Sequence, residues 1–156
     1  MFEGLFQPMH LVVILVVIPV VFYILTLRRA LKSCSAVSRT MAPNGVWILL
    51  IPVVNIVWHF FVVSKLARSL GNEFKRRNAP DATPKPGKSV GIAMCVFTCV
   101  AQVTGWSGAN NAGWTLWNLL GGATGIAGFI CWIVYWVQIA GYSRALRVLP
   151  EVGNTA

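Results

Sequence analysis

Two histidines are the side chains best suited to chemistry in this apolar chain, because imidazole can ligate haem iron or relay a proton. His10 stands at the start of the first long apolar stretch, and His59 stands near the end of the second. Haem ligation through His59 is one interpretation, but the two histidines occupy different ends of their stretches, so one haem would not reach both. The sequence therefore predicts no cofactor, and it predicts that His59 forms a hydrogen bond with another helix.

Ser107 is the candidate nucleophile. It stands in the sequence Gly-Trp-Ser-Gly at 105–108, which matches the Gly-x-Ser-Gly surround of the rhomboid protease serine. Such an enzyme needs a histidine on a later helix to take the serine proton. Both histidines precede Ser107, and the apolar stretches are too few for that fold. A polar external turn explains the glycines and the serine better.

Carboxylates and thiols suggest no further catalytic or metal site. Carboxylates inside membrane segments mark proton and cation pathways, but the acidic residues lie outside the apolar stretches; they are Glu3, Glu73, Asp81 and Glu151. The cysteines lack a zinc or C-x-x-C spacing and should pack as small apolar residues; they are Cys34, Cys95, Cys99 and Cys131. Cys34 is a candidate for palmitoylation by its position alone. We therefore predict that the protein is not an enzyme.

The elements that carry these residues follow from the composition. Of 156 residues, 56% are hydrophobic and 11% are charged, against about 45–50% and about 25% in soluble domains. A helix needs about 20 apolar residues to cross a bilayer. Four stretches without Asp, Glu, Lys or Arg approach that length, at 9–27, 46–64, 90–105 and 114–139. The sequence predicts an all-α polytopic transmembrane helical bundle, with residues 1–156 forming a single membrane domain.

The net charge of +9 gives the orientation, because positive residues favour the cytoplasmic side. The thirteen basic residues are confined to 28–39, 65–88 and 144–147. If four stretches span, the N-terminus is inside and the basic residues of 28–39 lie outside. If the stretch 46–64 enters and leaves on the cytoplasmic side, all thirteen lie inside. This second map has three spans plus one re-entrant or kinked helix, a periplasmic N-terminus and a cytoplasmic C-terminus. No nucleic acid is needed to explain the charge.

A helix break inside 46–64 suits re-entry. Pro52 removes one helical hydrogen bond and clashes with the preceding turn, and Asn55 can satisfy a backbone group that this frees. Irregular backbone at membrane depth is tolerated only where protein or water covers it. Pro52, Asn55 and His59 are therefore candidates for a helix break or a pathway, and a kinked full span is the alternative.

Residues 64–77 have the pattern of an interfacial amphipathic helix. Leu66, Leu70 and Phe74 form an apolar stripe, and Glu73 can pair with Arg77 at i,i+4. The basic side should contact anionic lipid headgroups; its members are Lys65, Arg68, Lys75, Arg76 and Arg77. Residues 78–88 are rich in proline and form a cytoplasmic linker.

The last apolar stretch carries the strongest helix-packing signal. Gly121 and Gly125 form a G-x-x-x-G pair, and Thr124 and Gly128 repeat the spacing of small residues. Small residues at this spacing let a second helix approach closely. The partner helix is expected either within the chain or in another subunit.

Residues 43–60 carry a distinct signature. Pro43 and Trp47, followed by Pro52, Asn55 and Trp58, give P-x-x-x-W and I-P-x-x-N-x-x-W. The pattern resembles a group of small bacterial multi-pass membrane proteins, which implies a multi-pass helical fold in the bacterial inner membrane. The start of the chain, 1–11, resembles the A-type subunit of the twin-arginine translocase, and this likeness implies an external N-terminus.

Together these features predict a non-enzymatic protein, a small structural or accessory subunit of a membrane protein assembly. Its expected partners are anionic lipids and either other membrane chains or further copies of itself. The alternative is a small oligomeric channel or transporter, with the break at Pro52–Asn55 near its pathway.

Overall fold

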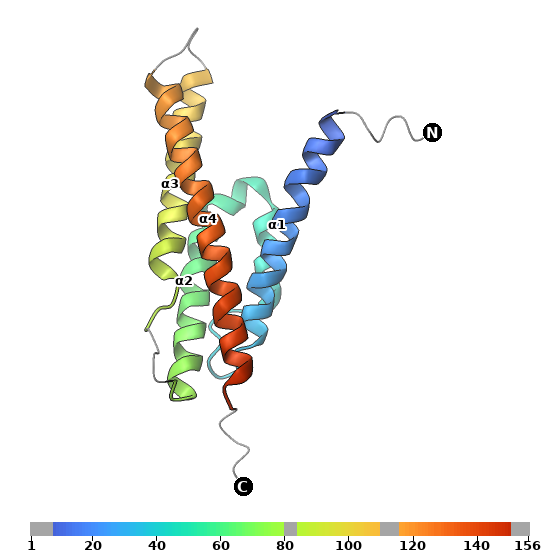
Figure 1. Ribbon diagram of the computed structural model, residues 1–156, viewed down its shortest axis with the longest axis vertical. Coiled ribbons are helices and arrows are strands. Elements are labelled where there is room, and N and C mark those ends of the chain that lie inside the picture. Colours follow the sequence, from blue (N-terminus) through green and yellow to red (C-terminus); the bar gives the residue numbers. More distant parts are fainter. Residues whose placement is uncertain (1–7, 80–83, 110–115, 151–156) are drawn as a thin grey trace, which may run out of the picture.

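The computed structural model describes residues 8–79, 84–109 and 116–150, and within these ranges every regular element is helical (Figure 1). In chain order they are α1 (Pro8–Lys32), the 3₁₀ helix η2 (Pro43–Leu50), α2 (Pro52–Arg76), α3 (Lys88–Ala109) and α4 (Leu116–Val148). The predicted all-α helical bundle is confirmed. The four α-helices are long and apolar enough to cross a membrane, which indicates a membrane protein.

Of the four long helices, α1, α2 and α4 run in one direction along the bundle, and α3 runs in the opposite direction (Figure 1). α3 and α4 form a tall antiparallel pair, and α1 inclines away from this pair toward its own N-terminus (Figure 1). α1 and α4 meet nearer their C-terminal ends, where the Trp136 indole N–H donates to Thr26 Oγ1 at 2.9 Å. The C-terminal ends of α1, α2 and α4 consequently lie at one end of the molecule.

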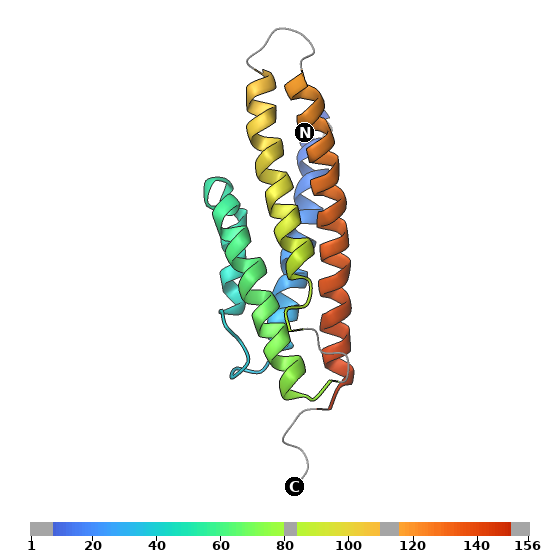
Figure 2. The same ribbon diagram turned by 90° about the vertical axis from the view of Figure 1, so that its left-hand side faces the viewer.

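Between α1 and α3, the chain forms a hairpin of η2 and α2 whose turn stops short of the far ends of α3 and α4 (Figure 2). The backbone break lies at Ile51, which is extended (φ −85°, ψ 109°), and Pro52 begins α2. The residue before a proline is biased away from helical angles. Proline itself suits the first helical position, where no N–H is needed. The sequence therefore dictates both the end of η2 and the start of α2.

Three hydrogen bonds fix the register of this hairpin. The Trp58 indole N–H donates to Gly45 O at 2.8 Å. Further down, the Thr40 hydroxyl donates to Lys65 O at 2.8 Å, and the Thr40 N–H donates to Ser69 Oγ at 2.9 Å. The segment after α1 thus runs antiparallel to α2 over most of its length, and both arms of the hairpin return to the same end of the bundle.

Residues 64–77 do not form a separate helix, because α2 continues through them to Arg76. Leu66, Leu70 and Phe74 are buried in the protein's own core, where Phe74 contacts the Tyr142 ring edge-on at 6.1 Å. An interfacial helix would place this stripe against lipid, whereas here the stripe belongs to the core that the long helices share. Apolar periodicity identifies a buried face, but it does not say which partner buries it.

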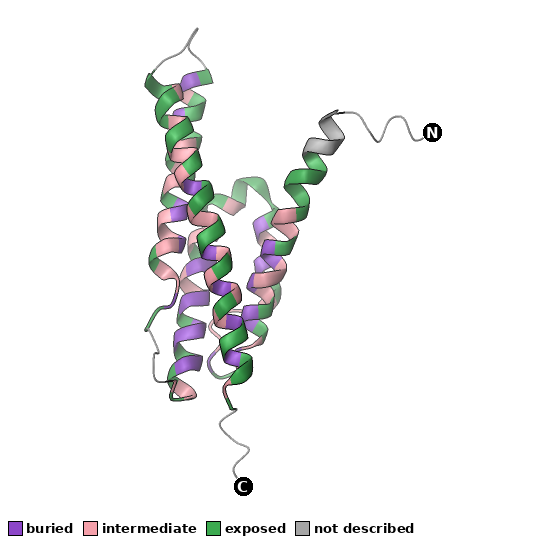
Figure 3. Ribbon diagram, in the orientation of Figure 1, coloured by how far each residue is buried: buried purple, intermediate pink, exposed green. Residues whose placement is uncertain are grey.

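The core lies near the end where α1, α2 and α4 terminate (Figure 3). Its largest fully buried side chains come from all four long helices and include Ile24, Leu27, Leu31, Leu66, Leu70, Met94, Tyr135, Ile139 and Leu146. Gly91 permits this convergence, since a Cβ there would lie 2.5 Å from Val63 Cγ1 and 2.8 Å from Tyr135 Cε2.

A buried carboxylate holds this end together. Glu73 is fully buried and accepts hydrogen bonds from the Ser35 N–H at 3.0 Å and the Ser35 hydroxyl at 2.8 Å. It also accepts from Arg76 Nη2 at 2.8 Å and from Arg77 Nε at 2.7 Å. The predicted i,i+4 pair between Glu73 and Arg77 is confirmed, and it is part of a larger network.

Arg77 extends the network to the other helices. Its Nη1 donates to Leu146 O at 2.7 Å and to Leu149 O at 3.0 Å, and its Nη2 donates to Ser33 O at 3.4 Å. Carbonyl groups at helix C-termini lack intrahelical partners. Arg77 therefore supplies donors to the ends of α1 and α4 while its charge is balanced by Glu73.

Replacing Glu73 by leucine should destabilise the fold by about 3–5 kcal/mol, because the Arg77 guanidinium would stay buried without its counter-charge. Thermal unfolding of the purified protein in detergent measures this loss as a lowered Tm. The control is Lys75→Leu, at an exposed position two residues away, which should leave the Tm almost unchanged. Equal Tm values for the two variants would contradict a stabilising role for Glu73.

Candidate functional site

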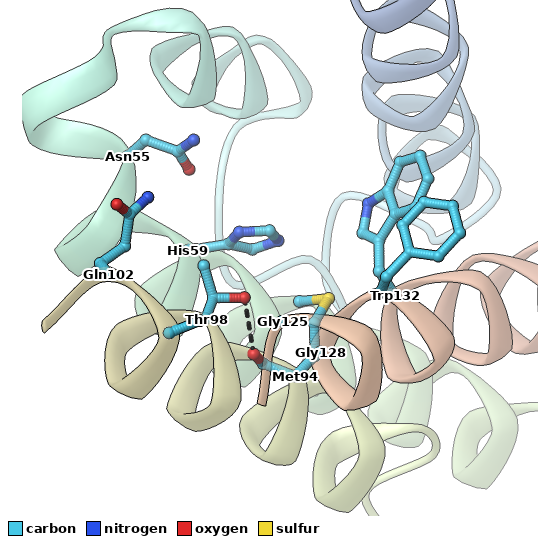
Figure 4. A pocket seen from close by; sticks show the side chains of 10 residues that line it. Asn55, His59, Met94, Thr98, Gln102, Gly125, Gly128 and Trp132 are labelled. Carbon is cyan, nitrogen blue, oxygen red and sulfur yellow. Dashed lines mark hydrogen bonds between the residues drawn. The ribbon is translucent and has the colours of Figure 1, made fainter. Parts of the chain in front are cut away.

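A cavity of about 490 Å³ lies beside the hairpin turn, between α2, α3 and α4 (Figure 4). It is lined by Asn55, His59, Met94, Thr98, Ala101, Gln102, Gly125, Gly128, Phe129 and Trp132. A second cavity of about 220 Å³ lies against the same region of α2 and α3. Four polar residues line both cavities, namely Asn55, His59, Thr98 and Gln102. We refer to these four as the polar wall.

Helical spacing builds the polar wall. Asn55 and His59 are four residues apart on α2, and Thr98 and Gln102 are four residues apart on α3. Residues at this spacing share one face of a helix, and Figure 4 shows the four side chains gathered between the two helices. The wall therefore exists because α2 and α3 are neighbours, each with a polar pair on the facing side.

His59 is held in place by α1. Its Nε2 lies 2.8 Å from the hydroxyl of Tyr23, a residue that is itself buried. This confirms the predicted hydrogen bond between His59 and another helix. Haem ligation through Nε2 would require this bond to break. The described residues contain no group of three or more His, Cys, Asp or Glu side chains able to hold a metal ion. The side chain of His10 lies outside the described part of the structure.

Asn55 has an unsatisfied polar atom. Its Oδ1 is buried and accepts no hydrogen bond from the residues that the structure describes. Leaving a buried acceptor unpaired carries a desolvation penalty of about 1–3 kcal/mol. The carboxamide at the helix break is thus free to accept a hydrogen bond from a molecule in the cavity.

Thr98 and Gln102 were missed by the reasoning from sequence. The Thr98 hydroxyl donates to Met94 O at 2.9 Å, which leaves its oxygen able to accept a hydrogen bond. Gln102 carries the one carboxamide within the stretch 90–105. The spacing of Thr98 and Gln102 at i,i+4 inside an apolar stretch could have marked them as a polar face of one helix. Whether that face meets Asn55 depends on which helices are neighbours, and the sequence does not give this.

The opposite wall is formed by α4 and contains part of the expected glycine packing motif. A Cβ at Gly128 would lie 3.4 Å from Phe97 Cβ, and a Cβ at Gly121 would lie 3.1 Å from Thr104 Oγ1. These two glycines therefore face α3 closely. A Cβ at Gly125 would meet nothing within 4 Å, so Gly125 leaves space for the cavity. The Thr124 hydroxyl donates to Leu120 O in its own helix.

The five basic residues expected at lipid headgroups differ in exposure. Arg68 and Lys75 are exposed, and Lys65 is half-buried with its Nζ 5.2 Å from the centre of the Phe61 ring. The side chain of Arg76 is 31% exposed, whereas that of Arg77 is 5% exposed. Arg77 is directed inward because its donors serve Glu73 and backbone carbonyls.

Cys34 is poorly placed for modification. It lies at the end of the bundle where α1, α2 and α4 terminate, which we call the basic end because Arg28, Arg76 and Arg147 lie there. Cys34 is buried, and its Sγ lies 3.5 Å from Ala30 O. Burial raises the pKa of the Cys34 thiol to about 12; the Glu73 carboxylate adds to this rise, while Arg39 and Arg77 oppose it. Since the thiolate is the reactive form, Cys34 serves as a small packing residue.

Comparison with known proteins identifies no relative of this chain. No family model matches it, and neither a curated protein nor a solved structure does so. The resemblances carried by residues 43–60 and 1–11 therefore stay predictions. The function is inferred from the geometry of the molecule itself.

Proposed function

We propose that this chain is a non-enzymatic integral membrane protein that serves as a small structural or accessory subunit of a membrane protein assembly. The supporting observation is the uncovered apolar surface far from the basic end. Residues 13–18 of α1 are consecutive large apolar side chains, and all six are exposed; they are Val13, Ile14, Leu15, Val16, Val17 and Ile18. Six consecutive residues cover every side of a helix, so this part of α1 requires lipid or another helix around it.

α4 offers a surface on which another membrane helix fits. Its exposed apolar residues include Leu119 and Ile126, and exposed Gly122 lies between them. A Cβ at Gly122 would meet nothing within 4 Å. Because a small residue lets a second helix approach closely, this face of α4 favours a partner chain over lipid alone. The partner is another membrane protein or a further copy of this chain.

The hairpin supports a re-entrant position for η2 and α2 in the membrane. It returns the basic segments 28–39 and 65–77 to the end where α4 reaches 144–147 (Figure 1). By the positive-inside rule we propose that this end is cytoplasmic, that the chain lies in a bacterial inner membrane, and that its N-terminus is periplasmic. Exposed Arg68 and Lys75 then lie on the side where anionic headgroups attract basic residues.

Labelling of single cysteines tests this topology, in a background with the four native cysteines replaced by alanine. Val37→Cys and Ser89→Cys occupy exposed positions on either side of the hairpin, and Leu116→Cys is exposed at the far end of α4. In intact cells, an impermeant thiol reagent should label Leu116→Cys and leave the other two unlabelled until the membrane is permeabilised. Labelling of Val37→Cys together with protection of Ser89→Cys would show that α2 spans the membrane.

Affinity purification after mild detergent extraction tests the accessory role. The tagged chain should co-purify with larger membrane proteins, which native mass spectrometry identifies in the intact complex. Gly122→Leu should reduce the recovered partner because the added side chain blocks close helix approach on α4. Recovery of the chain only as a lone symmetric oligomer would count against an accessory subunit.

A small channel or transporter is the second candidate, and the polar wall beside the helix break favours it. Polar side chains inside an apolar bundle commonly mark pathways for polar species. Reconstituted in liposomes, a channel would conduct ions, and Asn55→Leu should change that conductance. Val53→Leu is the matched control, since Val53 is exposed on the same helical turn. Absence of conductance in the unaltered protein would rule out an ion channel.

A further inference from the structure

We infer that the cavity between the polar wall and α4 binds an uncharged, lipid-soluble ring compound bearing hydroxyl or carbonyl groups, the class that includes quinols and quinones. This inference extends beyond the accessory role. It requires that the chain lies in a membrane, but it does not require a protein partner. Binding alone is proposed, with no chemical step.

The cavity has the size and position of a ligand site. Its volume of about 490 Å³ lies within the range of roughly 300–1,000 Å³ found for small-molecule pockets. It is open on one side rather than enclosed, and it lies at the level of the hairpin turn, among apolar helices (Figure 4). A lipid-soluble molecule can reach such a site from within the bilayer, with an apolar tail left in the lipid.

The described lining of both cavities contains no Asp, Glu, Lys or Arg side chain, which favours an uncharged ligand. A buried ion without a counter-charge is strongly disfavoured in a medium of low dielectric constant. Phosphate-bearing headgroups and fatty acid anions therefore fit this site poorly.

The polar wall selects a head group that both donates and accepts hydrogen bonds. Asn55 Oδ1 is buried without a partner and calls for a donor. The oxygen of Thr98 can also accept, since its proton is directed to Met94 O. The carboxamide of Gln102 offers donors and an acceptor. A hydroxyl group satisfies the acceptors, and a carbonyl oxygen can accept from the carboxamide N–H groups.

The opposite wall selects a flat ring. The rings of Phe129 and Trp132 lie 5.8 Å apart at an interplanar angle of 30°, and both residues line the cavity. Aromatic faces favour offset or edge contacts with a second π-system. Gly125 presents no side chain between these rings and the polar wall, so a ring can lie between them.

The test titrates decylubiquinol and decylubiquinone into the purified full chain in lipid nanodiscs, with Tm as the readout. A ligand that binds the folded state raises the Tm with its concentration. We expect a saturable rise for at least one of the two compounds. Gly125→Leu should fill the cavity and Asn55→Leu should remove the buried acceptor, and each should raise the half-saturating concentration at least tenfold.

Gly122→Leu is the matched control, because the same substitution three residues earlier on α4 points into open space. It should leave ligand binding unchanged even where it abolishes partner co-purification, so the two proposals can fail separately. Should Gly125→Leu lower the Tm of the free protein, Gln102→Leu at an exposed position replaces it, with the same expected loss of binding.

Three results would overturn the inference. The first is a Tm that does not respond to either compound in a saturable way. The second is unchanged binding in both cavity variants. The third is equal or tighter binding of n-decanol or of palmitate, which would replace the ring compound by a simple alkyl alcohol or by a fatty acid anion.

Discussion

A carboxylate buried in an apolar protein must be matched by donors on every side, and in this protein that requirement fixes the basic end of the bundle. Glu73 meets it with two arginines and with Ser35. Arg77, once placed by Glu73, supplies donors to the carbonyls of Leu146 and Leu149. The ends of α1, α2 and α4 are therefore positioned by one electrostatic requirement, and the apolar core forms directly beside it.

The hairpin depends on this anchor and satisfies a second requirement. Irregular backbone needs hydrogen-bond partners before it can lie among apolar surroundings. Trp58 and Thr40 supply some of them by donating to backbone carbonyls across the hairpin. The turn at Ile51 ends partway along the bundle, and α3 and α4 continue past it (Figure 2). Beyond the turn, α3 and α4 are no longer flanked by η2 and α2. The cavity lies where this flanking ends, and Asn55 lines it because it is next to the turn.

Sequence patterns predicted the elements better than their surroundings. The length of the apolar stretches predicted the helical bundle, and the missing N–H of proline predicted the break before Pro52. The i,i+4 spacing predicted the pairing of Glu73 with Arg77. The same patterns left open which partner covers each face. The stripe through Leu66 faces protein rather than lipid, and Arg77 is directed inward. The shared site of Thr98 on α3 with Asn55 and His59 on α2 depends on which helices are neighbours, and the periodicity of a single sequence does not contain that information.

The long sequence separation between Arg77 and its acceptors has a consequence for biosynthesis. The carbonyl of Leu146 is made 69 residues after Arg77, and that of Leu149 is made 72 residues after it. While the ribosome is still translating α3, the guanidinium can pair with Glu73 and donate to Ser33 O at the end of α1, but its two acceptors at the end of α4 do not yet exist. Until α4 is inserted, the Arg77 Nη1 group at the end of the hairpin therefore lacks its acceptors. Insertion of α4 supplies these acceptors and completes the hydrogen bonding of Arg77. Insertion of the final helix thus doubles as the closing step of folding.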